Sequence, residues 1–335
     1  MAYDKVVDSA SLDSKLTQVA DAIRTKGNTS ADLQFPSGFI SAIQAIQTGT
    51  ELQIIVTVTS GATVTATKGS KVVSGTAVNG TCTLTVPEAG TWSVKATLGG
   101  QTSNTASVSV KDSYALTLNF LKANFADNDW ASIIAACHSG SVPSSWVAGN
   151  SKTMTINGTS YQVDIIGKNH DTYAAGGTAP LTFQLHDCYA NTNQMNSSNT
   201  NVGGWTSCAM RNTHLPAILA LMPTEVQNGI REVNKLTSAG GQSVTINTTA
   251  DKLFLLSEVE IFGSATHSAA GEGTQYAYYK AGNSKVKNVS GSAKSWWERS
   301  PFASIANFFC LVGSDSNAGS NYASNSFGVA FGFCF

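Results

Sequence analysis

Charged side chains are scarce in this sequence. Asp, Glu, Lys and Arg make up 12% of the 335 residues, whereas an ordinary soluble domain has about 25%. The 20 basic and 21 acidic residues nearly cancel, which argues against a nucleic-acid binder or a polybasic membrane-surface protein, because both need concentrated positive charge. No run of 18 apolar residues occurs, so we expect no membrane insertion. Residues 1–7 lack the basic-then-apolar layout of a signal peptide, so we expect no export signal.

Motifs for metal binding and catalysis are also missing. The six cysteines form no CxxC pair and no zinc-finger spacing, so we interpret them as buried small hydrophobic residues. A disulfide between Cys310 and Cys334 stays open at this point. The only close polar groups are His170-Asp171 and His186-Asp187-Cys188, and neither has a partnered nucleophile at a recognisable spacing. We therefore expect no catalytic residue, no metal, no cofactor and no enzymatic activity.

Residues 1–49 predict a short helical segment. The first stripe of apolar residues and a second one after Pro36 both follow the helical period. Two such helices cannot bury a core alone. They either pack on each other or pack on sister chains or a larger assembly, and we favour the second alternative because small domains need such support. The stripes are Leu12, Leu16, Val19 and Ile23, then Phe39, Ile40, Ile43 and Ile46.

Residues 50–112 change to short alternating apolar segments separated by glycines, which is typical of a β-sandwich. The stretch Val86-Pro-Glu-Ala-Gly-Thr-Trp-Ser-Val94 resembles the strand–turn–strand of bacterial immunoglobulin-like modules. The resemblance implies a spacer without a site of its own.

Residues 113–335 predict an α+β domain. A helix after Asn128 or Asp129 is followed by a β-hairpin that turns at Asn157-Gly158. After Trp297 the chain is rich in Gly, Ser, Asn and Phe and has no helical period. The expected fold class is therefore α+β, with a sandwich and a helical segment before a mixed C-terminal domain.

Six stretches of this last region, taken in order, resemble a bacterial and phage domain family with a C-type-lectin-like fold, related to the formylglycine-generating enzymes. Members of this family include the variable proteins of diversity-generating retroelements, in which an error-prone reverse transcriptase rewrites adenines in a C-terminal segment. The stretches are Ile165-Ile-Gly-Lys-Asn-His-Asp171, Leu215-Pro-Ala-Ile-Leu219, Asp251-Lys-Leu-Phe-Leu-Leu-Ser-Glu258, Glu272-Gly-Thr-Gln-Tyr276, Trp296-Trp-Glu-Arg-Ser-Pro301 and Gly328-Val-Ala-Phe-Gly-Phe-Cys-Phe335.

The segments Ile23-Arg-Thr-Lys-Gly27 and Leu33-Gln-Phe-Pro-Ser-Gly-Phe39 resemble a repeat at the start of tail proteins from phages of gut bacteria. Together the two resemblances imply a virion protein at the tail tip that binds a host-surface protein or glycan. They also imply attachment to the tail or to sister chains in a homo-oligomer, for which we suspect a trimer. Sugar-binding C-type lectins use calcium motifs such as Glu-Pro-Asn or Trp-Asn-Asp, and none occurs here.

The last 36 residues carry a trace of such rewriting. Adenine changes in AAC or AAT codons give only codons that end in a pyrimidine, and these never encode Lys, Glu, Gln, Met or Trp. Residues 300–335 contain none of the five, although the chain holds 5 Met and 6 Trp. A buried, charge-poor segment would also avoid Lys and Glu, but it would not avoid Met and Trp.

If residues 300–335 are the variable region, the ligand-binding positions are those reachable from Asn by adenine changes. We expect an exposed apolar patch among them, while one of Phe308 and Phe309 points into the core. We expect Trp297 to be buried and Arg299 to bond backbone carbonyls as part of a rigid frame. The predicted ligand-binding residues are Phe302, Ala303, Ser304, Ile305, Ala306, Phe308, Leu311, Ser314, Asp315, Ser316, Ser320, Tyr322 and Phe327.

Two rival functions stay open. A bacterial surface adhesin with a lectin-like domain would place the protein on the cell surface, and the missing signal peptide disfavours it. An enzyme related to the formylglycine-generating enzymes is disfavoured by the absence of a recognised catalytic cysteine pair.

Overall fold

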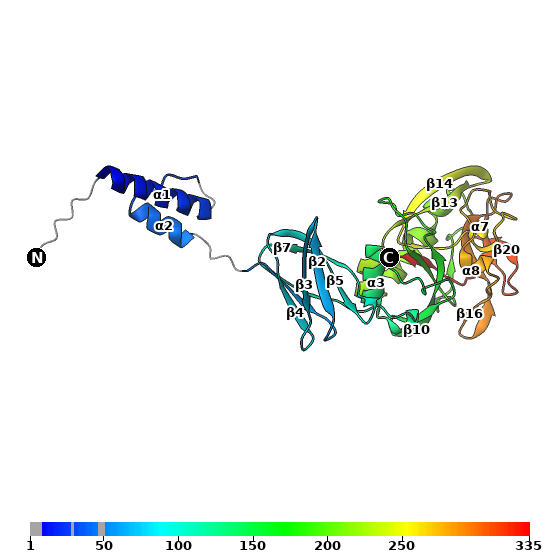
Figure 1. Cartoon of the computed structure of the whole chain (residues 1–335). Helices are drawn as coiled ribbons and strands as arrows, with labels where there is room; N and C mark the ends of the chain where they lie inside the picture. Colours follow the sequence, from blue (N-terminus) through cyan, green and yellow to red (C-terminus); the bar gives the residue numbers. More distant parts are fainter. Residues whose placement is uncertain (1–8, 28–29, 46–50) are drawn as a thin grey trace, which may run out of the picture. The chain divides into compact units, whose positions relative to one another are not determined.

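The computed structural model describes residues 9–27, 30–45 and 51–335 of the chain (Figure 1). Helices and strands are mixed throughout, so the predicted α+β class is confirmed. The chain divides into two compact units, the first with Met1–Val94 and Ser107–Thr117, the second with Lys95–Ala106 and Leu118–Phe335. The finer division into residues 1–49, 50–112 and 113–335 stays a prediction.

The two predicted N-terminal helices are present as α1 (Ser9–Gly27) and α2 (Ser37–Ala45). Ile23 of α1 and Phe39 of α2 are buried together with Ala20, so the helices pack on each other. Ile46, which we assigned to the second stripe, lies outside the described residues.

Eight strands follow. They form one sheet in the order β4-β1-β8 and another in the order β3-β2-β5-β6, in which β7 also pairs with β5. The predicted alternation holds in β4, where Cys82 and Leu84 are buried between exposed threonines. Strand β8 pairs with β1 in parallel although it begins just after the predicted boundary at residue 112. The strands are β1 (Gln53–Thr57), β2 (Thr63–Lys68), β3 (Lys71–Thr76), β4 (Thr81–Thr85), β5 (Gly90–Leu98), β6 (Gln101–Thr102), β7 (Ala106–Val110) and β8 (Ser113–Thr117).

The second unit is built on a sheet in the order β15-β22-β11-β10-β9. The predicted hairpin is confirmed, because β9 and β10 turn at Asn157-Gly158, where both residues have positive φ. The C-terminal strand β22 lies inside this sheet, between β15 and β11, and so the chain end is fully buried. The strands are β9 (Ser151–Ile156), β10 (Thr159–Lys168), β11 (Leu181–Leu185), β15 (Leu253–Phe254) and β22 (Gly332–Cys334).

Short helices pack around the strands of this unit. The first is α3 (Trp130–Ser139), which Asp129 caps by accepting a hydrogen bond from the Ser132 amide, and Gly140 ends it in the left-handed region. The others are α4 (Gly204–Ser207), α5 (Leu215–Leu219), α6 (Thr224–Gly229), α7 (Glu258–Phe262) and α8 (Ala277–Lys280).

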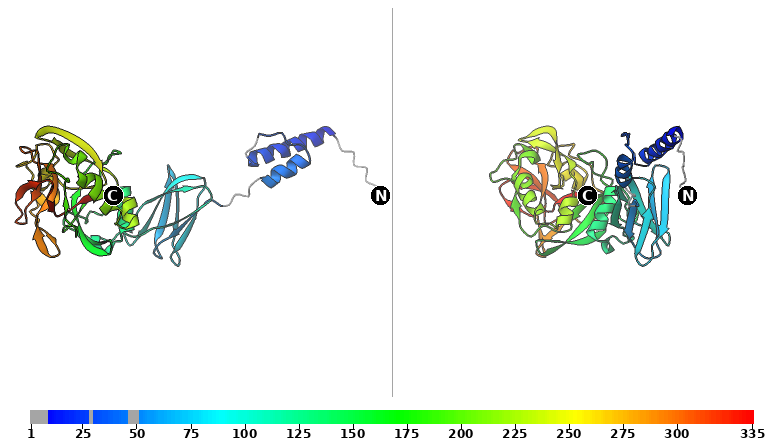
Figure 2. Two further views of the ribbon diagram at one scale, coloured as in Figure 1. Left: turned by 180° about the vertical axis from the view of Figure 1, so that it is seen from behind. Right: turned by 90° about the vertical axis from the view of Figure 1, so that its left-hand side faces the viewer.

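Four smaller sheets complete this unit. A long hairpin of β13 (Val233–Gly240) and β14 (Ser243–Asp251) forms an outer edge of the unit in the views of Figure 2. A three-stranded antiparallel sheet consists of β18 (Trp296–Pro301), β19 (Phe308–Val312) and β20 (Ala318–Tyr322). The remaining short strands are β12 (Asn193–Gln194) with β21 (Ser326–Phe327), and β16 (Lys287–Val289) with β17 (Ser292–Lys294).

All six cysteines are buried and free, so the open pairing of Cys310 with Cys334 is not made. Within residues 9–27, 30–45 and 51–335, no helix is both long and apolar enough to cross a membrane.

Candidate ligand-binding face

The predicted ligand-binding residues gather on the sheet of β18, β19 and β20. Most lie in its connections: residues 302–307 join β18 to β19, residues 313–317 join β19 to β20, and residues 323–327 follow β20. Strand pairing sets Phe308 opposite Tyr322, which brings the first and last of these segments to the same end of the sheet. We call residues 302–327 the variable face, because the sequence predicts that they vary.

Twelve of the thirteen predicted residues reach the surface at least in part. The exposed ones are Ser304, Ile305, Ser314, Asp315 and Tyr322, and the half-buried ones are Phe302, Ala303, Ala306, Phe308, Ser316, Ser320 and Phe327.

Leu311 is the exception, and its assignment to an exposed patch is wrong. It is only 6% exposed. Residues 309–312 of β19 are all buried, so both faces of the sheet are covered along this part of the strand, where Leu311 pairs with Trp297. The expectation that one of Phe308 and Phe309 is core is confirmed, because Phe309 is fully buried and Phe308 is not.

Aromatic rings form a row across the variable face. Phe302 stacks on His267 with ring centroids 5.3 Å apart, and it meets Phe308 edge-to-face at 6.1 Å. Phe308 in turn meets Tyr322 edge-to-face at 4.5 Å. His267 comes from outside the C-terminal segment, and its loop is tied down because Glu258 accepts hydrogen bonds from the amides of Thr266, His267 and Ser268. Sequence reasoning missed His267, which no motif distinguishes.

A buried asparagine holds the backbone of the first loop. The Nδ2 of Asn201 donates to the carbonyls of Phe302, Ile305 and Phe308 at 3.2, 2.9 and 2.7 Å. The backbone amide of Asn201 donates to the carbonyl of Ala306 at 2.7 Å, and the side-chain Oδ1 accepts from the backbone amide of Gly241 at 2.8 Å. Asn201 is fully buried, and sequence reasoning missed it as well.

Other residues from outside the variable face bind its main chain in the same manner. Gln242 donates to the carbonyl of Ser304 at 2.8 Å, and the amide of Ser314 donates to Ser295 Oγ at 3.2 Å. The amide of Ala303 donates to the carbonyl of His267 at 2.8 Å. Because these bonds use main-chain atoms of the face, they do not depend on which side chains the face carries.

Arg299 is at the centre of a group of buried charged residues beneath the face. We call this group, Arg299 with Glu260, Lys235 and Asp171, the frame. The buried Arg299 guanidinium donates to the carbonyls of Leu236, Leu255 and Glu272, and it forms a two-pronged ion pair with Glu260 at 2.5 and 2.9 Å. The expected carbonyl bonds of Arg299 and the expected burial of Trp297 are confirmed. The pairing with Glu260 was not predicted.

Glu260 connects Arg299 to a second buried ion pair. Lys235 Nζ lies 2.7 Å from Glu260 Oε1 and 2.8 Å from Asp171 Oδ1. Burial alone would raise the pKa of Asp171, but Lys235 outweighs it and holds this pKa at about 2. Burial likewise opposes ionisation of Glu260, yet Arg299 and Lys235 lower its pKa below the ordinary value. The lowered pKa values of Asp171 and Glu260 therefore favour the ionised form of both carboxyl groups at neutral pH.

Glu298 is a different case. Both carboxylate oxygens are buried without a hydrogen-bond partner among the described residues. Burial, with the negative charges of Glu258 and Glu272 nearby, raises its pKa well above the usual value. Burial therefore favours the neutral, protonated form of Glu298 in the folded chain.

This neutral acid predicts a pH effect on stability. The folded chain keeps a proton on Glu298 that the unfolded chain releases above the ordinary glutamate range, so folding weakens as pH rises, by up to about 1.4 kcal/mol per pH unit. We expect Glu298→Gln to flatten this slope between pH 5 and 8, measured as the urea midpoint at each pH. Parallel curves for the wild type and the variant would contradict the assignment, whatever the constant offset between them.

A matched pair of substitutions distinguishes face from core. We expect Leu311→Ala to lower the free energy of unfolding of the second unit by about 2–5 kcal/mol, because it removes buried volume. Ile305→Ala, at 39% exposure, should change it by roughly 0.5 kcal/mol or less. Urea unfolding followed by tryptophan fluorescence measures both. Similar losses of unfolding free energy for the two variants would contradict the placement of Leu311 in the core and Ile305 at the surface.

The polar side chains that are neighbours in His170-Asp171 and in His186-Asp187-Cys188 do not pair with one another. His186 Nδ1 lies 2.7 Å from Asp164 rather than from its neighbour Asp187, which instead accepts from Asn288. His170 packs on the ring of Tyr276 with centroids 4.0 Å apart. Among the described residues no hydrogen bond joins either imidazole to a hydroxyl or thiol of a nucleophile, and no cluster of three metal-ligating side chains occurs.

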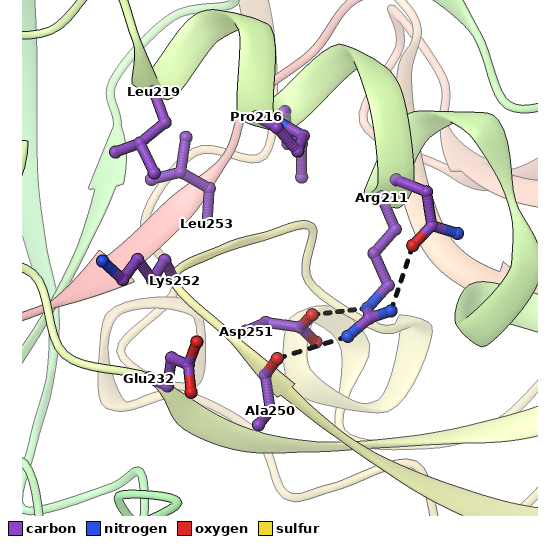
Figure 3. A pocket seen from close by; sticks show the side chains of 10 residues that line it. Arg211, Pro216, Leu219, Glu232, Ala250, Asp251, Lys252 and Leu253 are labelled. Carbon is purple, nitrogen blue, oxygen red and sulfur yellow. Dashed lines mark hydrogen bonds and ion pairs between the residues drawn. The ribbon is translucent and has the colours of Figure 1, made fainter.

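A cavity of about 270 Å³ lies elsewhere in this unit. Figure 3 shows the side chains that line it. Pro216, Leu219 and Leu253 form an apolar wall, and Arg211 spans the opposite side, donating to Asp251 at 2.5 Å and to the carbonyl of Ala250 at 3.2 Å. None of the thirteen predicted residues lines this cavity.

Comparison with known proteins adds one match. A family model described as a domain of unknown function (DUF6273) matches residues 181–334. No curated protein and no solved structure matches the chain. The matched span includes the variable face together with Asn201, Arg299 and most of the frame.

Proposed function

We propose that the protein is a phage tail receptor-binding protein whose variable face binds host-surface ligands and is diversified by adenine mutagenesis from a retroelement. In this proposal the second unit has a C-type-lectin-like fold related to the formylglycine-generating enzymes. The immunoglobulin-like sandwich is a spacer, and the helical segment attaches the chain to the tail or to sister chains. The protein would then reside at the tail tip of the virion.

One observation carries the proposal. The backbone of the variable face is held by Asn201, Gln242 and Ser295, which lie outside residues 300–335 and bind main-chain atoms. Side chains on such a backbone can change without removing what positions them. This is the property that a diversified segment needs, and it coincides with the segment from which Lys, Glu, Gln, Met and Trp are absent.

The chemistry of the face favours binding over catalysis. The ring row of Phe302, Phe308 and Tyr322 offers contact area at little cost in side-chain entropy. Asp315 is the single formally charged residue of the variable face. We therefore expect the face to bind a host protein or a glycan mainly through apolar contacts and hydroxyl groups.

The cysteines do not favour the rival enzyme. Catalytic thiols need a lowered pKa, because the thiolate is the reactive form. Burial raises the pKa of the Cys310 thiol well above its usual value, and burial does the same for Cys334.

Binding to cells tests the proposal. The fluorescently labelled full chain would be applied to a panel of gut bacterial isolates and read by flow cytometry. We expect some isolates to bind, and we expect Ile305→Ser with Tyr322→Ser to weaken that binding by on the order of 100-fold, as loss of central apolar contacts does. Val78→Ser, at a sandwich position that is 67% exposed, is the control and should bind like the wild type. Equal binding by the double variant, or no binding to any isolate, would count against the proposal.

A further inference from the structure

A further cavity of the second unit is lined mainly by polar side chains. It has a volume of about 310 Å³ and lies between the start of β10, the segment that follows β11, and the hairpin of β16 and β17. This volume is at the small end of the range for ligand sites, about 300–1,000 Å³. The cavity shares no residue with the variable face, so a small ligand bound here would be separate from whatever the face binds.

Two polar atoms at this cavity belong to side chains that are held in position. Asp164 is buried and binds His186 Nδ1 at 2.7 Å, which fixes the imidazole ring. Asp187 Oδ1 accepts from the amide and from the side chain of Asn288 at 2.8 and 3.0 Å. Neither His186 Nε2 nor Asp187 Oδ2 makes a hydrogen bond within the described part of the chain. Both residues line the cavity, so these two atoms are available to a ligand there.

An aromatic ring forms part of the same wall. Tyr161 lines the cavity, and Tyr189 stacks on it with ring centroids 5.6 Å apart and an interplanar angle of 22°. Tyr189 is buried and Tyr161 is half-buried, so the ring face of Tyr161 that is turned away from Tyr189 is the one left for a ligand. The Tyr161 hydroxyl accepts from the amide of Ala190 at 3.3 Å, which helps to hold the ring. A flat apolar face beside polar atoms suits a ligand that is itself apolar on one side and polar at its edge.

The turn between β16 and β17 adds a hydroxyl to the cavity at a conformational cost. Ser290 and Gly291 form this two-residue turn with φ of 50° and 79°, and both line the cavity. Asn or Gly is favoured at the first position of such a turn, because a left-handed backbone is strained for serine. Strained residues cluster at binding sites. A serine at this position therefore agrees with a binding role for its hydroxyl.

The charges around the cavity favour an uncharged ligand. Asp164 and Asp187 are acidic. The ammonium of the buried Lys287 donates to the carbonyls of Leu185 and His186 at 2.5 and 2.8 Å. Burial lowers the pKa of Lys287 to about 8, so it still carries a charge at neutral pH, and the hydrogen bond with Asp164 raises the pKa of His186. Because acidic and basic groups nearly cancel here, neither an anionic nor a cationic ligand is favoured.

We propose that this cavity binds a neutral sugar. Sugar hydroxyls both donate and accept hydrogen bonds, so they can pair with Asp187 Oδ2, His186 Nε2 and Ser290 Oγ. The C–H groups on one face of a sugar ring can pack on Tyr161. An apolar ligand would instead leave these polar atoms unpaired, which is unfavourable. The sugar is either free in solution or the terminal residue of a surface glycan. The site lies outside residues 300–335, so its specificity would stay constant while the variable face changes.

Saturation-transfer NMR on the full chain tests the site. The probes are glucose, galactose, mannose, fucose and N-acetylglucosamine, each at about 10 mM, where a site with a Kd of about 1 mM is nearly filled. We expect at least one of them to bind. Asp187→Asn keeps the acceptor for Asn288 but replaces the unpaired oxygen with an amide nitrogen, so it should weaken binding by on the order of 10-fold or more. Asp127→Asn changes an exposed aspartate of the same unit; it is the control and should bind like the wild type.

Two further variants separate sugar binding from stability and from the variable face. Ser290→Gly removes the hydroxyl but relaxes the turn, so it should weaken sugar binding without lowering the urea midpoint. Ile305→Ser with Tyr322→Ser changes the variable face and should leave sugar binding unchanged. The proposal would be overturned if no probe sugar binds, if either cavity variant binds like the wild type, or if the variable-face variant loses the sugar.

A glycan array distinguishes a free sugar from a surface glycan. The array is probed with the Ile305→Ser and Tyr322→Ser chain, so that the variable face contributes little to the signal. Signals that Asp187→Asn removes in this background would support a site for a terminal glycan residue. An empty array together with binding of a probe sugar by NMR would support a site for a free sugar. Array signals that persist with Asp187→Asn would contradict the assignment of sugar binding to this cavity.

Discussion

Replacing Arg299 with methionine is expected to lower the free energy of unfolding of the second unit by roughly 3–5 kcal/mol, the cost of leaving a buried partner charge uncompensated. The loss arises at two places. Glu260 would keep Lys235 as its ion-pair partner but lose its two-pronged contact. The carbonyls of Leu236 and Leu255 would lose the donor that satisfies them inside the protein. Urea unfolding followed by tryptophan fluorescence measures the change.

Two further variants separate the causes. Arg299→Lys keeps the charge but loses the planar guanidinium that reaches a carboxylate and carbonyls at once. Its free energy of unfolding should therefore lie between those of the wild type and Arg299→Met. Arg231→Met is the control in the same unit. Arg231 is exposed, with its guanidinium 5.4 Å from the Tyr173 ring, and its loss should cost about 1 kcal/mol or less. An Arg299→Met variant no less stable than Arg231→Met would contradict this account of the frame.

Replacing Asn201 with alanine is expected to loosen the loop of residues 302–308 without changing any side chain of the variable face. The carbonyls of Phe302 and Ile305 would lose the side-chain donor, and each buried unpaired carbonyl costs about 1–3 kcal/mol. The carbonyl of Phe308 would keep only the amide of Phe302. We expect amide exchange in this loop to speed up by on the order of 30-fold or more, measured by hydrogen exchange and mass spectrometry. Binding to a responsive bacterial isolate should fall with it.

Asn201→Asp should do at least as much damage as alanine, because it sets a carboxylate against three carbonyl oxygens. Asn199→Ala is the matched control. Asn199 is an exposed asparagine two residues away whose Oδ1 accepts from the amide of Ser324 at 3.3 Å, and its loss should leave exchange of residues 302–308 unchanged. If Asn201→Ala exchanges like Asn199→Ala, the backbone of the face is held by something other than Asn201.

The sequence predicted the features that depend on residues close together along the chain. The turn at Asn157-Gly158, the Asp129 cap and the stripe of α1 depend on residues close in sequence, and the structure shows each of them. The carbonyl bonds of Arg299 were expected from its motif. Its partner Glu260 lies 39 residues away along the chain, and no spacing rule connects the two.

The candidate site shows the same limit. Asn201 stands in a stretch rich in Asn and Ser and contacts residues 101 to 107 positions later, so only the folded chain distinguishes it from Asn196 or Asn199. Leu311 was assigned to the face because its codon is reachable from Asn by adenine changes, a criterion that says nothing about burial, and β19 is buried on both faces at this position. Whether both faces of a strand are covered is a tertiary property.

The most direct test of the central claim is to sequence the 3′ end of the gene across a phage population and compare it with any template copy nearby. The proposal predicts substitutions that concentrate in codons 302–327, fall at adenines of the template, and leave the codons of Trp297, Arg299 and Asn201 unchanged. Substitutions spread evenly along the gene, or a segment that does not vary at template adenines, would contradict it.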